Sequence, residues 1–181
     1  MRTLHVKAAL ACAATAFFLA GCSPTYNWRD YSSPDAPFRV MFPDKPASHT
    51  RTVDLGGIKV AMTMTAAEVD GAMFAVGTAE APDAEQAEAA LGAMKNALLN
   101  NIKATIKSEK SGKASAATDS TSARSAAIDI EATGSKNGEP MRLVGHFESR
   151  NKRFYQVIVM GKEKQLSKEN VEQFMSSFKL Q

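Results

Sequence analysis

The sequence predicts a single α+β domain, an antiparallel β-sheet flanked by helices, behind a cleaved N-terminal signal. Three observations predict it. Apolar and polar residues alternate in several short runs that are separated by Gly, Asp and Asn turns, which is typical of an antiparallel meander. Two other segments repeat their apolar residues at helical spacing. An uncharged apolar stretch occupies positions 8–20, close to the N-terminus.

The first 21 residues have the layout of a bacterial export signal. Arg2 and Lys7 precede the apolar stretch, which is too short to cross about 30 Å of hydrocarbon as a helix. The four residues that end it, Leu19-Ala20-Gly21-Cys22, resemble the lipobox of bacterial lipoproteins. In that family the cysteine thiol is acylated and the signal is cut just before it. A plain secretory peptide or an uncleaved anchor is the alternative.

The lipobox resemblance implies an address for the mature chain. Residues 1–21 would be removed, and acyl chains on Cys22 would hold the protein on a bilayer. Ser23 follows the cysteine. By resemblance to enteric lipoproteins, a serine there permits transfer to the outer membrane, whereas an aspartate favours retention in the inner one. We therefore expect the periplasmic face of the outer membrane, with the inner membrane as the alternative.

Removal of the signal changes the charge and the cysteine content. The full chain carries 22 Lys and Arg against 19 Asp and Glu, a net charge of +3. Without residues 1–21 the counts are 20 and 19, so nucleic acid is not an expected partner. Cys12 leaves with the signal and Cys22 receives lipid, so no internal disulfide is expected.

Residues 22–37 are expected to form a tether, and residues 38–181 a single domain. The tether is polar and is interrupted by three prolines. It also contains Tyr26 and Trp28. Packing of these rings against the edge of the domain is the favoured interpretation, and a place in the lipid headgroup layer is the alternative.

The domain begins with a predicted meander. Phe38, Val40 and Phe42 alternate with Arg39 and Met41 up to a proline, and a hairpin turn is expected at Gly56-Gly57. Asp70-Gly71 predicts a second two-residue turn. The expected strands are residues 38–42, 50–55, 58–64 and 73–76.

A helix is predicted after Asp83, a suitable N-cap, because Ala87, Leu91, Met94, Leu98 and Ile102 recur at spacings of three and four. Residues 107–127 contain no large apolar side chain, which predicts a mobile excursion or weak edge strands. Further strands are expected at residues 127–133, 141–148 and 154–160, with turns at Lys136-Asn137-Gly138 and Asn151-Lys152. Ser167 is expected to cap a terminal helix with apolar residues at 171, 174, 175 and 178.

This order of strands and helices resembles the PsbP-like fold, to which DcrB and other small bacterial lipoproteins are similar. The local cues are Phe-x-Val-x-Phe-Pro at residues 38–43 and the closing helix with Phe174 and Phe178. Tyr26-Asn27-Trp28-Arg29 soon after the lipobox cysteine also resembles a family of uncharacterised proteobacterial lipoproteins. These families imply a location and a fold and no activity.

No catalytic, metal or cofactor motif is present in the sequence. The mature chain has two histidines, His49 and His146, and neither has a second ligand at metal spacing beside it. The glycine-rich phosphate loop, the serine elbow of hydrolases and paired zinc cysteines are also missing. We therefore expect a protein that is not an enzyme and that holds no cofactor and no metal.

Three functions remain open. The favoured one is a non-catalytic, lipid-anchored periplasmic domain that binds a protein or another envelope component. The alternative is a small-ligand carrier with a pocket between helix and sheet, for which the expected lining is Met62, Met64, Met73, Phe74 and Met94. A hydrolase without a recognisable motif is third.

Overall fold

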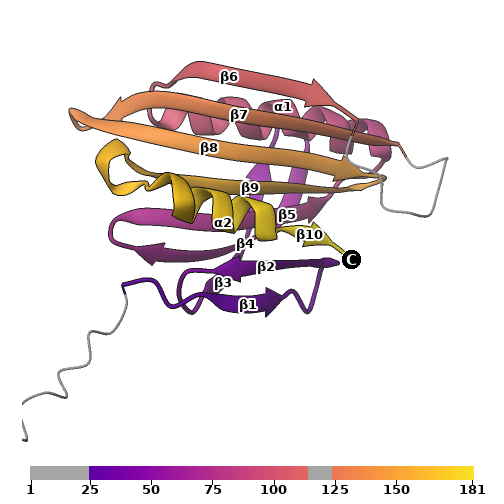
Figure 1. Ribbon diagram of the computed structural model, residues 1–181. Coiled ribbons are helices and arrows are strands. Elements are labelled where there is room, and N and C mark those ends of the chain that lie inside the picture. Colours follow the sequence, from indigo (N-terminus) through magenta and orange to yellow (C-terminus); the bar gives the residue numbers. More distant parts are fainter. Residues whose placement is uncertain (1–24, 114–123) are drawn as a thin grey trace, which may run out of the picture.

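Figure 1 shows the computed structural model, which describes residues 25–113 and 124–181. Within these ranges the chain forms strands, two α-helices and a short 3-10 helix. Their bounds are β1 (Arg29–Ser32), β2 (Phe38–Phe42), β3 (Ala47–Asp54), β4 (Lys59–Val69), β5 (Ala72–Glu80), α1 (Ala84–Asn101), β6 (Thr105–Gly112), β7 (Ser125–Lys136), β8 (Glu139–Arg150), β9 (Arg153–Lys162), η1 (Glu163–Gln165), α2 (Lys168–Ser177) and β10 (Lys179–Leu180). The class is α+β with antiparallel sheets, as predicted.

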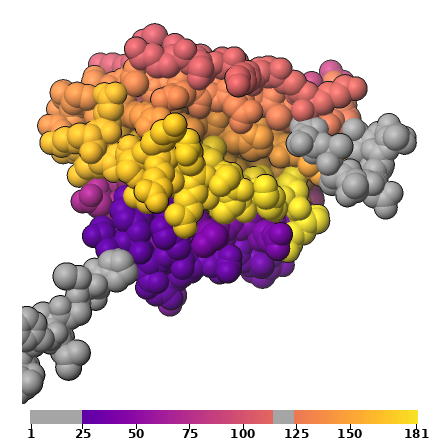
Figure 2. Space-filling model, viewed as in Figure 1, coloured from indigo at the N-terminus to yellow at the C-terminus, as the bar shows by residue number. Residues whose placement is uncertain are grey.

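The larger sheet has seven strands in the order β3-β4-β5-β9-β8-β7-β6, and every neighbouring pair is antiparallel. Two meanders build it: β3 to β5, and β6 to β9. Helix α1 connects them and carries the chain from the centre of the sheet to the far edge. The smaller sheet has the order β1-β2-β10, so it joins the N-terminal part of the domain to its C-terminal part. Figure 2 shows the two parts, indigo and yellow, side by side on one face of the molecule.

Two predicted hairpin turns have the backbone that their residues favour. Asp70 and Gly71 have φ angles of 52° and 73°, and Asn137 and Gly138 have 53° and 81°. Positive φ at both central residues matches the twist of antiparallel strands, and Asp, Asn and Gly adopt it at least cost. These turns fix the register of β4 on β5 and of β7 on β8.

Each face of the large sheet is covered by a different layer (Figure 1). Helix α1 packs on one face over β7, β8 and β9, and helix α2 with the small sheet packs on the other. Side chains alternate between the faces along each strand, so each side has its own core. Leu91, Met94 and Phe147 belong to the α1 side, and Phe74 and Phe174 to the α2 side.

The caps of both helices agree with the sequence prediction. The Asp83 carboxylate accepts a hydrogen bond from the Gln86 backbone N–H at 2.8 Å, and the Ser167 hydroxyl accepts one from the Asn170 N–H at 3.2 Å. The predicted buried stripe of α1 is wrong at one position. Leu99 is 8% exposed and belongs to the core, whereas Leu98 is only partly buried and lies at the border of a groove.

The N-terminal part of the described chain differs from a plain tether. Strand β1 lies within the range 22–37 and pairs with β2 from Arg29 opposite Phe42 to Ser32 opposite Arg39. The rings of Tyr26 and Trp28 stack on each other at 6.0 Å and both meet the edge of Phe74. These contacts support packing against the domain, the favoured interpretation. A four-residue strand among prolines is too short for its alternation to be recognised.

The polar segment 107–127 begins in an edge strand. Strand β6 has β7 as its only partner within the described part of the chain. Its pairing shifts register between Ile106 and Ser108, and the strand is exposed along its whole length. Weak edge pairing was one of the two expectations for this segment. The remaining strands extend beyond their predicted bounds because their terminal residues are mostly polar or small and interrupt the apolar alternation.

Candidate functional site

A groove of 510 Å³ lies between α1 and the part of the large sheet that this helix does not cover. Five methionines line it, and we call it the methionine groove. They come from β4, β5, α1 and β9: Met62, Met64, Met73, Met94 and Met160. Apolar side chains of β3, β4, α1 and β9 complete the walls. The volume lies within the usual range for small-molecule sites.

Strand alternation builds the floor of the methionine groove. Met62 and Met64 are two residues apart on β4 and point to the same face. Gly77 lies opposite Met64 on β5, and a Cβ atom there would lie 2.5 Å from both Met62 Cε and Met64 Sδ. The glycine therefore gives these two thioethers the space to lie directly against the sheet.

Few polar groups meet the methionine groove. The Gln156 side-chain amide donates to Met64 Sδ at 3.6 Å. The Asp54 carboxylate stabilises the neighbouring turn, because it accepts a hydrogen bond from the Gly57 backbone N–H at 2.7 Å. Arg51 lines the groove from the exposed edge strand β3, and its guanidinium has no hydrogen bond or ion pair with another described residue. The groove thus combines an apolar interior with one unpaired cation.

The predicted lining of the helix–sheet pocket is confirmed for four residues and wrong for one. Met62, Met64, Met73 and Met94 all border the groove. Phe74 belongs to the opposite core, where its ring packs against Phe174 at 5.4 Å. Adjacent residues of a strand point to opposite faces, so Met73 and Phe74 cannot both line one pocket.

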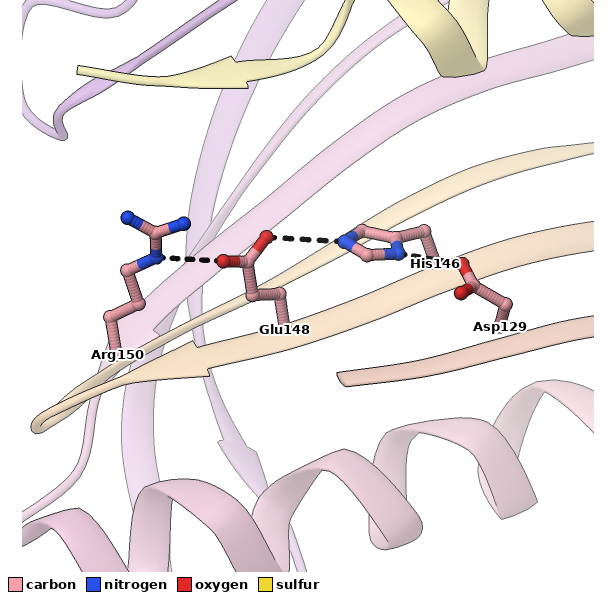
Figure 3. A network of polar contacts seen from close by, with 4 residues as sticks. All are labelled: Asp129, His146, Glu148 and Arg150. Atoms are coloured by element: carbon pink, nitrogen blue, oxygen red, sulfur yellow. Dashed lines mark hydrogen bonds and ion pairs between the residues drawn. The ribbon is translucent and has the colours of Figure 1, made fainter. Parts of the chain in front are cut away.

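A second polar arrangement lies on the other face of the sheet and is shown in Figure 3. His146 of β8 is held between two carboxylates, with Nδ1 2.7 Å from Asp129 and Nε2 3.2 Å from Glu148. Arg150 donates to the second oxygen of Glu148 at 2.7 Å. The four residues form the histidine network. Its centre is buried, since the side chain of Glu148 is 8% exposed.

The carboxylates decide how the histidine network titrates. Burial alone lowers the pKa of His146, but its hydrogen bonds to Glu148 and Asp129 outweigh that effect and raise the pKa above 6.5. Burial raises the pKa of Glu148, but hydrogen bonds from His146 and Arg150 bring it below 4.5. Tyr155 lies opposite Glu148 on β9, and burial raises the pKa of its phenol to about 12.

The sequence prediction did not identify the histidine network. Asp129 meets His146 only through the pairing of β7 with β8, which residue spacing does not reveal. The i, i+2 order of His146, Glu148 and Arg150 was a usable signal for three polar side chains on one strand face. In the described part of the chain, the side-chain partners of His146 are carboxylates and not a hydroxyl, so the network contains no activated nucleophile.

A third feature is a cleft of 330 Å³ between the small sheet and the β4–β5 part of the large sheet. Ser and Thr side chains form its floor, and we call it the hydroxyl pocket. Its hydroxyl-bearing strand residues are Tyr31, Ser48, Thr63, Thr65 and Thr78. It lies on the α2 side of β4, so the sheet separates it from the methionine groove.

The predicted lipobox, Leu19 to Cys22, and Ser23 lie outside the described residues, 25–113 and 124–181. Within those ranges no helix has the length and apolar character needed to cross a membrane. The same ranges contain no group of three His, Cys, Asp or Glu side chains arranged to hold a metal ion. No known family model matches the chain, and no curated protein is significantly similar to it.

Proposed function

We propose that the protein is a non-catalytic binding domain whose methionine groove holds a small apolar ligand. One observation carries this proposal: five thioethers from four different elements line one concave volume of 510 Å³. Methionine is flexible and polarizable, so a wall of methionines adapts to ligands of different shape. This proposal gives the small-ligand carrier precedence over the binding of a protein or envelope component, which the sequence alone favoured.

The lining indicates the chemistry of the ligand. An apolar body would contact the thioethers of Met62, Met64 and Met73, and burial of its surface would supply most of the affinity. Arg51 would pair with an anionic or hydrogen-bond-accepting group near the mouth. An amphiphile with one such group fits both features.

We also propose the address and the finer fold that the resemblances imply. The Leu19-Ala20-Gly21-Cys22 pattern supports cleavage after residue 21, acylation of Cys22 and tethering to a bilayer. Ser23 supports the periplasmic face of the outer membrane. An antiparallel sheet with helices on its two faces is compatible with a PsbP-like domain. In this proposal the ligand is taken up at a membrane surface outside the cytoplasm.

Mass spectrometry of bound molecules tests the ligand proposal. The full-length chain is purified in lipid nanodiscs and its ligands are released by denaturation, with empty nanodiscs as the blank. Ala97→Phe adds a ring to an exposed helix position that lines the methionine groove. Asn96→Phe adds the same ring to the neighbouring exposed position, which does not line it. We expect wild type and Asn96→Phe to retain a small molecule, and Ala97→Phe to retain at least about tenfold less.

Melting temperatures of the two variants show whether a loss of ligand is separate from a loss of stability. Both variants should keep the wild-type melting temperature, because both positions are exposed. Equal retention by Ala97→Phe and wild type, or no molecule above the nanodisc blank in wild type, contradicts the proposal.

A protein partner is the second candidate, and strand β3 is the observation that favours it. Among residues 25–113 and 124–181, this eight-residue edge strand pairs only with β4, and it is exposed along nearly its whole length. Its free backbone edge is able to accept a strand from another protein. Thr52→Pro removes one backbone donor of β3. Crosslinking in intact cells should recover a partner with wild type and lose it with Thr52→Pro; recovery of the same partner by both excludes pairing through this edge.

A further inference from the structure

The hydroxyl pocket contains a buried polar atom without a partner. Thr78 is 7% exposed and lines the pocket, and its Oγ1 has no hydrogen bond with any described residue. Buried hydroxyls are nearly always paired, so an unpaired one at the wall of a cleft calls for an explanation. A threonine hydroxyl changes its position by rotation about χ1, so the Thr78 side chain has more than one hydroxyl position at the pocket wall.

The neighbouring hydroxyls are ordered by cross-strand pairs. Ser48 and Thr65 hydrogen-bond through their side chains at 2.8 Å, and Thr50 and Thr63 do so at 2.7 Å. Each hydroxyl has one donor and two acceptor sites, so every pair retains the capacity for further hydrogen bonds. Thr78 lies directly opposite Thr63 on β5. The floor of the pocket is therefore a fixed array of groups that both donate and accept.

The rim supplies charge and an aromatic surface. Arg153 is paired with Glu80, and both line the pocket. Asp35 also lines it and has no hydrogen bond or ion pair with another described residue. The three groups together carry one net negative charge. The half-buried ring of Tyr31 forms part of the wall.

We propose that the hydroxyl pocket is a binding site for a saccharide ring that is neutral or carries an amine. The hydroxyl array matches a ligand whose own hydroxyls both donate and accept. The aromatic wall suits the C–H face of a sugar ring, and the carboxylate of Asp35 favours an amine and repels an acidic sugar. This site is on the opposite face of β4 from the methionine groove and does not depend on the function proposed for that groove.

Titration with three sugars tests the charge preference. The full-length chain in nanodiscs is titrated calorimetrically with diacetylchitobiose, glucosamine and glucuronate. We expect the first two to bind, and glucuronate to bind at least about tenfold more weakly. Asp35→Asn should reduce that discrimination, because it removes the unpaired carboxylate. Binding of glucuronate as tight as that of glucosamine to wild type would overturn the proposed chemistry.

Two threonine variants test the location. Thr78→Val removes the unpaired hydroxyl at constant shape, and we expect at least a fivefold loss of affinity. Thr52→Val makes the same change at an exposed β3 position outside the pocket and should bind as wild type. Thr78→Val breaks no hydrogen bond within the described part of the fold, because the Thr78 hydroxyl has no partner there. The substitution therefore costs no stability through a lost hydrogen bond. Unchanged binding by Thr78→Val, or no binding of any of the three sugars by wild type, refutes the site.

A free sugar and a glycan polymer offer the same chemistry. Sedimentation with insoluble chitin, with and without competing diacetylchitobiose, separates the two sources. Retention that the soluble sugar displaces indicates a polymer-binding site, and calorimetric binding without retention indicates a free saccharide. Both results support the site, and absence of both overturns it.

Discussion

Gly134 belongs to β7 and faces residues 102–104, where the chain leaves α1. We expect Gly134→Ala to be severely destabilising. A Cβ atom there would collide with the carbonyl oxygen of Ile102 and lie 2.9 Å from Cα of Ala104. Both are backbone atoms. The Ile102 carbonyl also accepts a hydrogen bond from the Ser135 N–H at 2.8 Å, so it cannot move away without breaking that bond.

Gly77→Ala is the matched substitution with a milder expected effect. Its Cβ would also come too close to other atoms, at 2.5 Å from Met62 Cε and Met64 Sδ. These are the ends of flexible side chains beside an open groove, and they are able to move. The close contact is therefore relieved by rotamer changes and not by a shift of the backbone.

The two substitutions should lower the free energy of unfolding by different amounts. Overpacking against fixed atoms costs about 1–3 kcal/mol and occasionally more, and we expect about 3 kcal/mol or more for Gly134→Ala, including the strained hydrogen bond. For Gly77→Ala we expect less than about 1 kcal/mol, because alanine regains about 0.5–1 kcal/mol over glycine inside a strand.

Urea unfolding of the full-length chain in a non-ionic detergent measures both losses. Trp28 is the single tryptophan and packs on Phe74, so its fluorescence reports on the core. Equal losses for Gly134→Ala and Gly77→Ala, or a larger loss for the latter, would refute the distinction between backbone and side-chain obstacles.

Three further outcomes are expected. The raised pKa of His146 means that its protonated form stabilises the fold fully below pH 6.5 and that this contribution is lost as pH rises through the raised value. Melting temperature should therefore fall as pH rises above about 6.5 in wild type and stay flatter in His146→Gln; equal slopes count against the network. Phe174→Ala should cost about 3–5 kcal/mol in urea unfolding, since this ring is fully buried, and Met175→Ala clearly less. Cys22→Ser should abolish incorporation of labelled fatty acid in cells, and labelling that survives contradicts the lipobox prediction.

Local signals in the sequence predicted most of the fold. Asp83 and Ser167 begin the helices because each offers a side-chain acceptor to the first turn, and this depends on residues only three positions away. Asp70-Gly71 and Asn137-Gly138 predicted their turns for an equally local reason. Strands β1 and β6 were harder, because exposed or very short strands lack apolar alternation.

The candidate sites depended on information that spacing does not contain. Four of the five groove methionines were predicted from composition and strand parity, and Met160 was not. Phe74 was misplaced where that parity was not applied. Asp129 and His146 are 17 positions apart and meet only through the β7–β8 register. The hydroxyl pocket lies between two sheets whose relative placement follows from the packing of β2 and α2.

The small sheet also determines how the domain responds to a pull from its N-terminal side. Arg29 at the start of β1 pairs with Phe42 at the end of β2, and the connecting loop lies at the other end of this hairpin. Tension applied ahead of β1 therefore breaks the hydrogen bond from the Asn27 N–H to the Pro43 carbonyl first. It then opens the β1–β2 pairs one after another from Arg29 and Phe42, and does not shear them together. In a chain tethered through Cys22, β1 would separate first and lengthen the tether. The α2-side core would lose the rings of Tyr26, Trp28 and Tyr31, while the seven-stranded sheet and the core under α1 stay intact.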